Sequence, residues 1–229
     1  MSDRLHRCRL LLGEENLTKL QKATVMVVGC GAVGSFAIDA LVRSGVGHII
    51  LVDFDRVEET NINRQMFATQ NTLKQKKTAA AREHIAVISP SILVTEMDIF
   101  FDKNTNPPAR PDFVIDAIDT VQSKIALYEW CTKNNVPFIS SMGAARKTDP
   151  TRIKIDKLSK TYACPLAKQV RKLAREHNIP DFPVVFSTEI PAPQKTPDKN
   201  MGSIITVTGT FGLFTANYAI KYIVNSNNW

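Results

Sequence analysis

Three glycines with G-x-G-x-x-G spacing, Gly29, Gly31 and Gly34, constrain the fold of this chain more than any other feature. They directly follow a β-branched run at residues 24–28, which is typical of a strand covered on both faces. A helical pattern over residues 33–43 comes next. In this context the first glycine permits a tight turn, the second lets backbone approach a phosphate, and the third allows close helix–strand packing. The sequence therefore predicts a nucleotide-binding turn.

Strand and helix patterns alternate after this turn. Further strands are expected at residues 48–53, 92–97, 113–117 and 138–142, and helices at residues 71–88 and 121–134. This βαβ succession predicts an α/β fold, a Rossmann-like, doubly wound and mostly parallel sheet. Beyond Met142 we expect a mixed C-terminal extension, with a helix at 157–177, a short strand at 184–187 and a mobile, substrate-facing loop at 190–200.

The 229 residues contain no internal repeat and no linker, so we expect a single domain over residues 1–229. Within it, residues 1–145 form the nucleotide-binding half and residues 146–229 the substrate-facing half. Residues 201–220 carry no charge, which raises the question of a membrane span. Their many threonines and glycines favour a buried strand followed by a core helix, without stable membrane insertion.

The four cysteines lie far apart and include no C-x-x-C pair, which argues against a four-thiolate zinc site. A disulfide framework is not expected in so long a chain with a well-stocked core, and this favours a reducing compartment. The first ten residues have scattered charges and no apolar stretch, unlike a signal peptide. We therefore expect a cytoplasmic protein.

Asp53 ends the second predicted strand, 19 residues after Gly34. An acidic side chain at this place can accept hydrogen bonds from ribose hydroxyls. The alternative is that Asp53 only caps the next turn. Up to this point an NAD-dependent enzyme fits equally well.

Further charged and polar residues follow Asp53 in an order that favours ATP over a dinucleotide. Asp55, Asn61 and Arg64 come directly behind it, and Lys77 lies early in the next helix. Asp119 closes the motif DAID at the carboxyl edge of the sheet, where ligands bind in open α/β folds. Arginine and lysine at this edge suit a triphosphate, and an aspartate beside them suits Mg²⁺. Taken singly, each is more typical of a solvated surface residue.

Together these motifs resemble the ubiquitin-activating-enzyme-like (ThiF/MoeB-type) adenylyltransferases, which include the molybdopterin and thiamine sulfur-carrier activating enzymes. The matching segments are GCGAVG at 29–34, LVDFDRVEETNINRQ at 51–65, DAID at 116–119 and RCRLLLG at 7–13, together with Lys77. The resemblance covers roughly the first 145 residues and implies ATP and Mg²⁺ as cofactors.

The resemblance also implies a role for each matching residue. Asp53 would hold the ribose, with Asp55 beside it in the same site. Asn61, Arg64 and Lys77 would bind the ATP phosphates, and Arg64 and Lys77 would act in catalysis. Asp119 would organise Mg²⁺, and Arg7 would reach the nucleotide site of the partner subunit across a homodimer.

Within that family, the second half resembles the tRNA threonylcarbamoyladenosine dehydratases. The similar stretches are SMGAA at 141–145, TDPT at 148–151, PLAK at 165–168, VVFSTE at 184–189 and GSIITVTG at 202–209. Sulfur-carrier activators generally keep two C-x-x-C pairs for zinc, and this chain has none. Cys164 departs from the pattern, since many relatives have aspartate there. We expect a small packing residue, with a thioester-forming nucleophile as the alternative.

The implied enzyme is an ATP-dependent adenylating cyclase or dehydratase acting on tRNA, in the ligase class. A carboxylate of the modified nucleoside would attack the α-phosphate of ATP, and an internal nitrogen would then close a ring and expel AMP. No base for ring closure is identifiable. Two alternatives stay open: an enzyme that adenylates a ubiquitin-like or sulfur-carrier partner, and a non-catalytic or NAD-binding Rossmann protein.

The chain carries a net charge of +7, which favours anionic partners. Ten basic and two acidic residues lie between Arg146 and Arg175, a surplus that exceeds the charge of the whole chain. Four of them share one helical stripe, and a solvated face is the plain reading of such a stripe. Beside an adenylation site, a phosphate-backbone contact fits better. The predicted tRNA contacts are Arg146, Lys147, Lys168, Arg171, Lys172 and Arg175.

Overall fold

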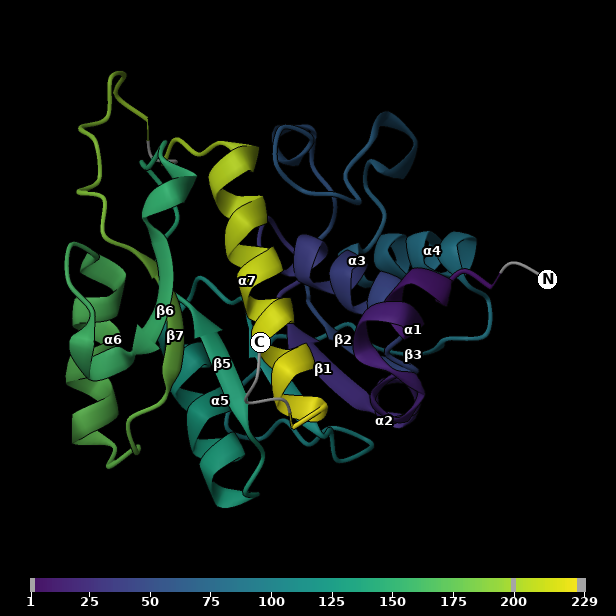
Figure 1. Ribbon diagram of the computed structural model, residues 1–229. Helices are drawn as coiled ribbons and strands as arrows, with labels where there is room; N and C mark the ends of the chain where they lie inside the picture. The colour runs from purple at the N-terminus through teal and green to yellow at the C-terminus, as the bar shows by residue number, and fades with distance from the viewer. Residues whose placement is uncertain (1–2, 199–200, 226–229) are drawn as a thin grey trace.

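A seven-stranded sheet runs through the computed structural model, which describes residues 3–198 and 201–225 (Figure 1). Its strands are β1 (Thr24–Val28), β2 (His48–Val52), β3 (Leu93–Met97), β4 (Phe113–Asp116), β5 (Phe138–Ser141), β6 (Ile153–Lys157) and β7 (Pro183–Ser187). The order across the sheet is β3-β2-β1-β4-β5-β7-β6. Every pair is parallel except β6 with β7 at one end. The predicted Rossmann-like, mostly parallel sheet with a mixed C-terminal extension is therefore confirmed.

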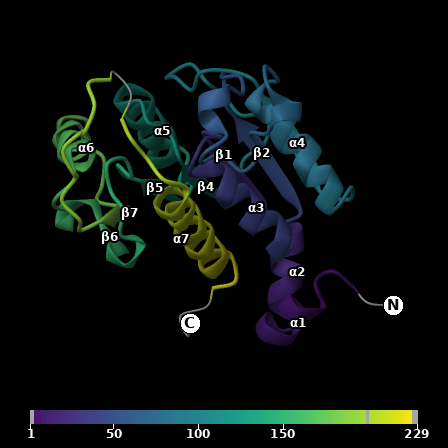
Figure 2. The ribbon, with the colours of Figure 1, turned by 90° about the horizontal axis from the view of Figure 1, so that it is seen from above.

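Helices cover both faces of the sheet (Figure 2). They are α1 (His6–Leu12), α2 (Glu14–Lys22), α3 (Gly34–Ser44), α4 (Lys77–Ile88), α5 (Val121–Lys133), α6 (Pro165–Glu176) and α7 (Ile205–Ile223). The apolar side chains of α3, α4 and α7 share one core with alternate residues of the strands, such as Val25 and Val27. The intervening residues, such as Met26 and Val28, face α5. Covering both faces explains why the central strands are continuous apolar runs.

Two predicted helices begin later in the structure than the sequence indicates. The helix expected from residue 71 begins at Lys77, because Lys74 and Lys77 donate backbone hydrogen bonds to Val57 and Asp55 instead. The helix expected from residue 157 begins at Pro165, since residues 153–157 pair with β7 as an edge strand. Proline suits the first position of a helix because it has no N–H to leave unpaired.

The uncharged segment at 201–220 forms most of α7, and the strand expected before the helix is absent from the described residues 201–204. α7 packs closely on α3: a Cβ on Gly212 would lie 2.3 Å from the carbonyl oxygen of Val33. The helix is therefore a core element, as expected. No helix in the described parts of the chain is long and apolar enough to cross a membrane.

Candidate functional site

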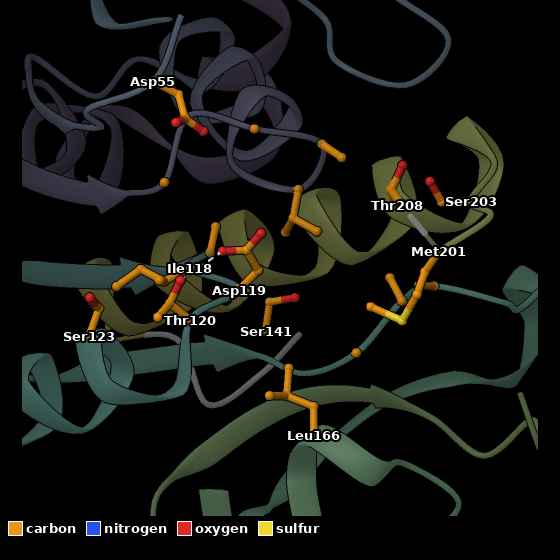
Figure 3. Close-up of a pocket in the computed structure, with 18 of the residues that line it drawn as sticks. Asp55, Ile118, Asp119, Thr120, Ser123, Ser141, Leu166, Met201, Ser203 and Thr208 are labelled. Carbon is orange, nitrogen blue, oxygen red and sulfur yellow. Dashed lines mark hydrogen bonds between the residues drawn. The ribbon is translucent and has the colours of Figure 1, made fainter. Parts of the chain in front are cut away.

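A pocket of about 930 Å³ opens at the carboxyl ends of the central parallel strands. Its lining comes from the turn after β1, the loop after β2, the turn between β4 and α5, and the loop after β5 (Figure 3). This edge is where ligands bind in open α/β sheets, because the polar strand ends and helix N-termini meet there. Ten of the predicted site residues line it: Gly29, Gly31, Asp53, Asp55, Asn61, Arg64, Lys77, Asp119, Arg146 and Lys147.

The glycine turn brings backbone close to the pocket. Gly29 has a φ of +95°, and a Cβ there would lie 2.6 Å from the Ala117 carbonyl oxygen. A Cβ on Gly34 would lie 1.7 Å from the carbonyl oxygen of Gly29, so α3 approaches β1 only because this residue is glycine. Around Gly31, by contrast, a Cβ would meet only the Gln65 amide nitrogen, at 3.8 Å. The middle glycine therefore leaves open room for a ligand such as a phosphate.

Asp53 follows β2 and is held firmly by backbone. Its Oδ2 accepts a hydrogen bond from the Cys30 amide at 2.7 Å, and its Oδ1 accepts one from the Asp55 amide at 2.8 Å. Burial raises the pKa of this carboxyl, while the nearby charge of Lys77 and the two amides act in the opposite direction. A carboxylate oxygen can accept more than one hydrogen bond, so the site keeps acceptor capacity for hydroxyl groups.

Lys77 begins α4 and is buried, and its Nζ lies 2.7 Å from Oδ2 of Asp55. Arg64 is more accessible: its guanidinium donates to the Thr60 carbonyl at 2.7 Å and to Oδ1 of Asn63 at 2.8 Å. Both cations line the pocket. They are the positive charges that follow Asp53 in the sequence.

Asn61 has a local structural partner. Its side-chain oxygen accepts from the Glu58 amide at 3.1 Å, and the Glu58 side chain caps the same short 3₁₀ helix in return. The Asn61 side chain therefore fixes the loop that carries Arg64, in addition to any contact that it makes with a ligand.

Asp119 lies in the turn between β4 and α5, with its side chain exposed toward the pocket (Figure 3). Thr120 Oγ1 donates to its Oδ1 at 3.3 Å. No group of three or more His, Cys, Asp or Glu residues within the described ranges is arranged to hold a metal ion. A cation at Asp119 would need further oxygen ligands from a bound molecule, and Mg²⁺ typically takes them from substrate phosphates.

The hydroxyl of Ser123 in the first turn of α5 is buried. Ser123 lines the pocket, is almost fully buried, and its Oγ has no hydrogen-bond partner among the residues that the structure describes. A buried hydroxyl without a partner is costly, so such a group normally finds one. A ligand bound in this pocket could supply it.

The loop after β5 brings the second half of the chain into the same pocket. Lys147 is 2% exposed, and its Nζ donates to the Ser187 carbonyl at 3.0 Å. Burial lowers the pKa of this amine, against the opposing influence of Cys164 and Glu189. Because Lys147 is enclosed, its amine is not available at the surface for a contact with tRNA. It lines the pocket instead.

Cys164 also lines the pocket and is buried. It is the N-cap residue of α6, and its Sγ accepts a hydrogen bond from the Ala167 amide at 3.4 Å. A Cβ on Gly143 would lie 3.3 Å from this sulfur, so the two residues pack closely. Capping and packing account for the position of the thiol.

The remaining predicted contacts lie outside the pocket. Lys168, Lys172 and Arg175 are exposed on α6, in the predicted stripe. Arg171 differs, because its guanidinium is half-buried and donates to the carbonyls of Leu158 and Thr161. It anchors the preceding turn.

Arg7 lies exposed on α1 and does not line this pocket.

A buried ionic network beneath the pocket was missed by sequence reasoning. Lys124 Nζ lies 2.8 Å from Asp116 Oδ2, with both side chains fully buried. Tyr128 and Ser140 donate to the same oxygen, and Lys124 also donates to the Ser141 carbonyl at 2.8 Å. The network therefore ties the end of β4 to the end of β5, directly below two loops of the site. A charged residue within the helical pattern of α5 is the one signal that could have indicated it.

The sequence profile of the ThiF family matches residues 3–228, nearly the whole chain. The chain belongs to the ThiF family. Among curated relatives of this ThiF family member, the tRNA threonylcarbamoyladenosine dehydratase of Bacillus subtilis is 46% identical over 195 residues, covering 83% of this chain and 77% of the relative. The molybdopterin-synthase adenylyltransferase of Salmonella typhimurium is 36% identical over 133 residues, covering 57% of this chain and 53% of the relative.

Solved structures agree with the sequence comparison. The tRNA N6-threonylcarbamoyladenosine dehydratase of E. coli, crystallised in complex with ATP, matches this ThiF family member with a TM-score of 0.91 and 34% identity. The match covers 97% of this chain and 94% of the E. coli chain. The resemblance to the tRNA threonylcarbamoyladenosine dehydratases is therefore confirmed.

Proposed function

We propose that this protein uses ATP to dehydrate threonylcarbamoyladenosine in tRNA, through an acyl-adenylate of the threonine carboxylate. The observation that carries the proposal is the pocket itself. An open glycine turn, a ribose-compatible aspartate and two cations line one cavity, in a chain that matches the dehydratases over most of its length.

Adenylation asks the protein to align two anions and to neutralise charge, with little covalent work of its own. In this proposal the ribose hydroxyls bind Asp53 and the phosphates lie over the glycine turn. Arg64 leaves its contacts with Thr60 and Asn63 to bind the phosphates, and Lys77 turns toward them from Asp55. The two cations then stabilise the negative charge that builds up when the carboxylate attacks the α-phosphate.

Mg²⁺, held by Asp119 together with phosphate oxygens, would neutralise the leaving pyrophosphate. Its fit rests on the exposed carboxylate of Asp119 in the pocket. Cation binding would need the nucleotide, because one carboxylate supplies too few ligands.

Ring closure follows from the adenylate. An internal nitrogen of the modification attacks the activated carbonyl carbon, and the bond to the AMP oxygen breaks. The nitrogen loses its proton, and AMP leaves with one of the original carboxylate oxygens. The net change is the loss of one water from the nucleoside, with conversion of ATP to AMP and pyrophosphate, in keeping with a ligase-type mechanism.

We also propose the arrangement around this site. The protein is a single domain in which residues 1–145 bind ATP and residues 146–229 face tRNA. It forms a homodimer in which Arg7 of one subunit reaches the nucleotide of its partner. Each residue of α1 stays at least partly exposed, including Leu10 and Leu11 at 74%. Contact with a second subunit would cover this apolar surface.

A second candidate is adenylation of a small carrier protein, favoured by the similarity to the Salmonella adenylyltransferase. Exchange of labelled pyrophosphate into ATP separates the two candidates. We expect exchange with tRNA that carries threonylcarbamoyladenosine, and none with unmodified tRNA or with carrier proteins. Exchange with carrier proteins alone would replace the proposed substrate, and exchange with no acceptor would contradict both enzymatic functions.

A further inference from the structure

Tyr162 is an exposed aromatic residue close in sequence to residues that line the pocket. Tyr162 is 54% exposed, although large aromatic side chains usually bury most of their surface. It stands two residues before Cys164, and Cys164, Pro165, Leu166 and Gln169 at the start of α6 line the pocket. The ring therefore lies next to the segment that forms one side of the site.

Two neighbours hold this ring in place. Its edge contacts Phe186 of β7, with centroids 5.7 Å apart and planes at 75°. Phe186 is fully buried, so it is a fixed support. Lys154 of β6 places its Nζ 5.4 Å from the Tyr162 centroid and 5.3 Å from that of Phe186. A ring fixed in advance loses little conformational entropy when a ligand stacks on it.

The backbone that carries Tyr162 is also fixed. Arg171 on α6 donates to the carbonyls of Leu158 and Thr161, at 3.3 and 2.8 Å. Thr161 Oγ1 donates back to the Leu158 carbonyl at 2.7 Å. Arg171 therefore fixes the turn that precedes Tyr162.

The surroundings of the ring are basic. Lys157 and Lys160 precede it in exposed positions, and Lys168 lies exposed one turn into α6. Lys154 adds its charge directly at the ring. An exposed aromatic ring among cations is the combination that binds single-stranded RNA, because the cations attract phosphates and the ring stacks with an unpaired base.

We propose that Tyr162, supported by Phe186 and Lys154, stacks on an unpaired base of the tRNA next to the modified nucleoside. This inference rests on the proposed function, and it names a contact for the same site. A nucleoside must leave the base stack to enter an enzyme pocket, and this exposes the neighbouring bases. A ring next to the pocket-lining start of α6 can then take the place of the lost stacking partner.

Binding of modified tRNA to Tyr162→Ala, measured at several salt concentrations, tests the proposal. We expect the tRNA affinity to fall by about fivefold to a hundredfold, the range seen for one base–aromatic stack. The slope of log affinity against log salt should stay unchanged, because no charge is removed. Tyr162→Trp should bind tRNA like the wild type. ATP affinity should be the same in all variants.

Tyr222→Ala is the matched control. Tyr222 is 49% exposed and also leans on a buried phenylalanine, Phe113, with centroids 5.1 Å apart. It does not line the pocket, and we expect wild-type tRNA affinity.

Wild-type affinity in Tyr162→Ala, a changed salt slope, or a Trp variant as weak as the Ala variant would each overturn the stacking contact. If the wild type closes the ring in tRNA while Tyr162→Ala binds normally, only this contact is wrong. If the wild type neither binds nor converts modified tRNA, the proposed function fails with it. If Tyr162→Ala weakened the binding of a carrier protein and left tRNA binding unchanged, the surface around Tyr162 would be assigned to a protein partner.

Discussion

At the scale of single residues, the candidate site combines groups that are fixed with groups that are free to move. Asp53 is held by two backbone amides, while the guanidinium of Arg64 makes two hydrogen bonds within its own loop. A fixed acceptor can orient a ribose, and a movable cation can follow charge as it develops on phosphate oxygens. The motif spacing predicts both residues, because they lie within 12 positions of each other in one loop.

Arg64→Ala or Lys77→Ala should lower the rate of adenylation by about 10²–10³-fold, the usual cost of removing one group that stabilises the transition state. Pyrophosphate exchange with modified tRNA measures this rate. Arg110→Ala is a suitable control, because Arg110 also donates to two carbonyls, those of Asn134 and Asn135. A variant that retains near-normal ring closure would show that the assigned residue is not part of the site.

Cys164→Ser should keep most of the ring-closing activity, because serine can also accept the helix-capping hydrogen bond. The rate of AMP release with modified tRNA measures it, and circular dichroism checks the fold. Complete loss of ring closure in a folded Cys164→Ser variant would support the alternative that Cys164 forms a thioester.

At the scale of elements, the carboxyl edge of the sheet carries the pocket, and the buried network around Asp116 and Lys124 lies below it. Local patterns predict the glycine turn and the central strands, since each is encoded within a few residues. They do not predict β6, which exists because residues 153–157 pair with β7 about 30 positions later. Nor do they predict the burial of Lys147, whose amine bonds to the carbonyl of Ser187 in β7. Both depend on contacts between segments distant in sequence.

Lys124→Met should destabilise the fold by about 3–5 kcal/mol, because it leaves the buried charge of Asp116 without its ionic partner. Urea unfolding measures the change. The double variant Asp116→Asn, Lys124→Met should recover part of the loss, since no uncompensated charge remains. A single variant as stable as the wild type would show that the Lys124–Asp116 ion pair does not stabilise the fold.

The stripe on α6 leads to a salt-dependence prediction. Reversing the charge of Lys168 and Lys172 should weaken tRNA binding and reduce the salt slope by about 0.7–0.9 for each phosphate that the variant no longer neutralises. Lys172 now lies 3.8 Å from Glu176, a weak exposed pair that gives little stability. Reversal of Lys22 and Lys133, at the ends of α2 and α5, serves as the control. An unchanged salt slope would mean that the α6 stripe serves solubility and does not contact tRNA phosphates.

At the scale of the whole molecule, the candidate pocket is lined by residues from both halves of the chain. The glycine turn and the loop after β2 come from the first half, and the loop after β5 and the start of α6 come from the second. Sequence reasoning finds the ATP motifs because they are short and ordered along the chain. Its choice of possible tRNA contacts considers charge without burial, and the structure buries Lys147 and uses Arg171 to anchor a turn.

Mixing inactive subunits tests the proposed homodimer. Arg7→Ala and Arg64→Ala should each be inactive alone, but random pairing of equal amounts should restore about one quarter of wild-type activity. Half of the dimers are then mixed, and each mixed dimer has one site with both arginines. No recovery after exchange of subunits would place Arg7 in its own subunit's site or outside catalysis.

The fate of one oxygen atom tests the central claim most directly. Modified tRNA is prepared with ¹⁸O in the threonine carboxylate and incubated with the protein, ATP and Mg²⁺. An acyl-adenylate predicts one ¹⁸O in the phosphate of AMP for each nucleoside that loses water. Label in inorganic phosphate, or ring closure without label in AMP, would contradict adenylation of the carboxylate.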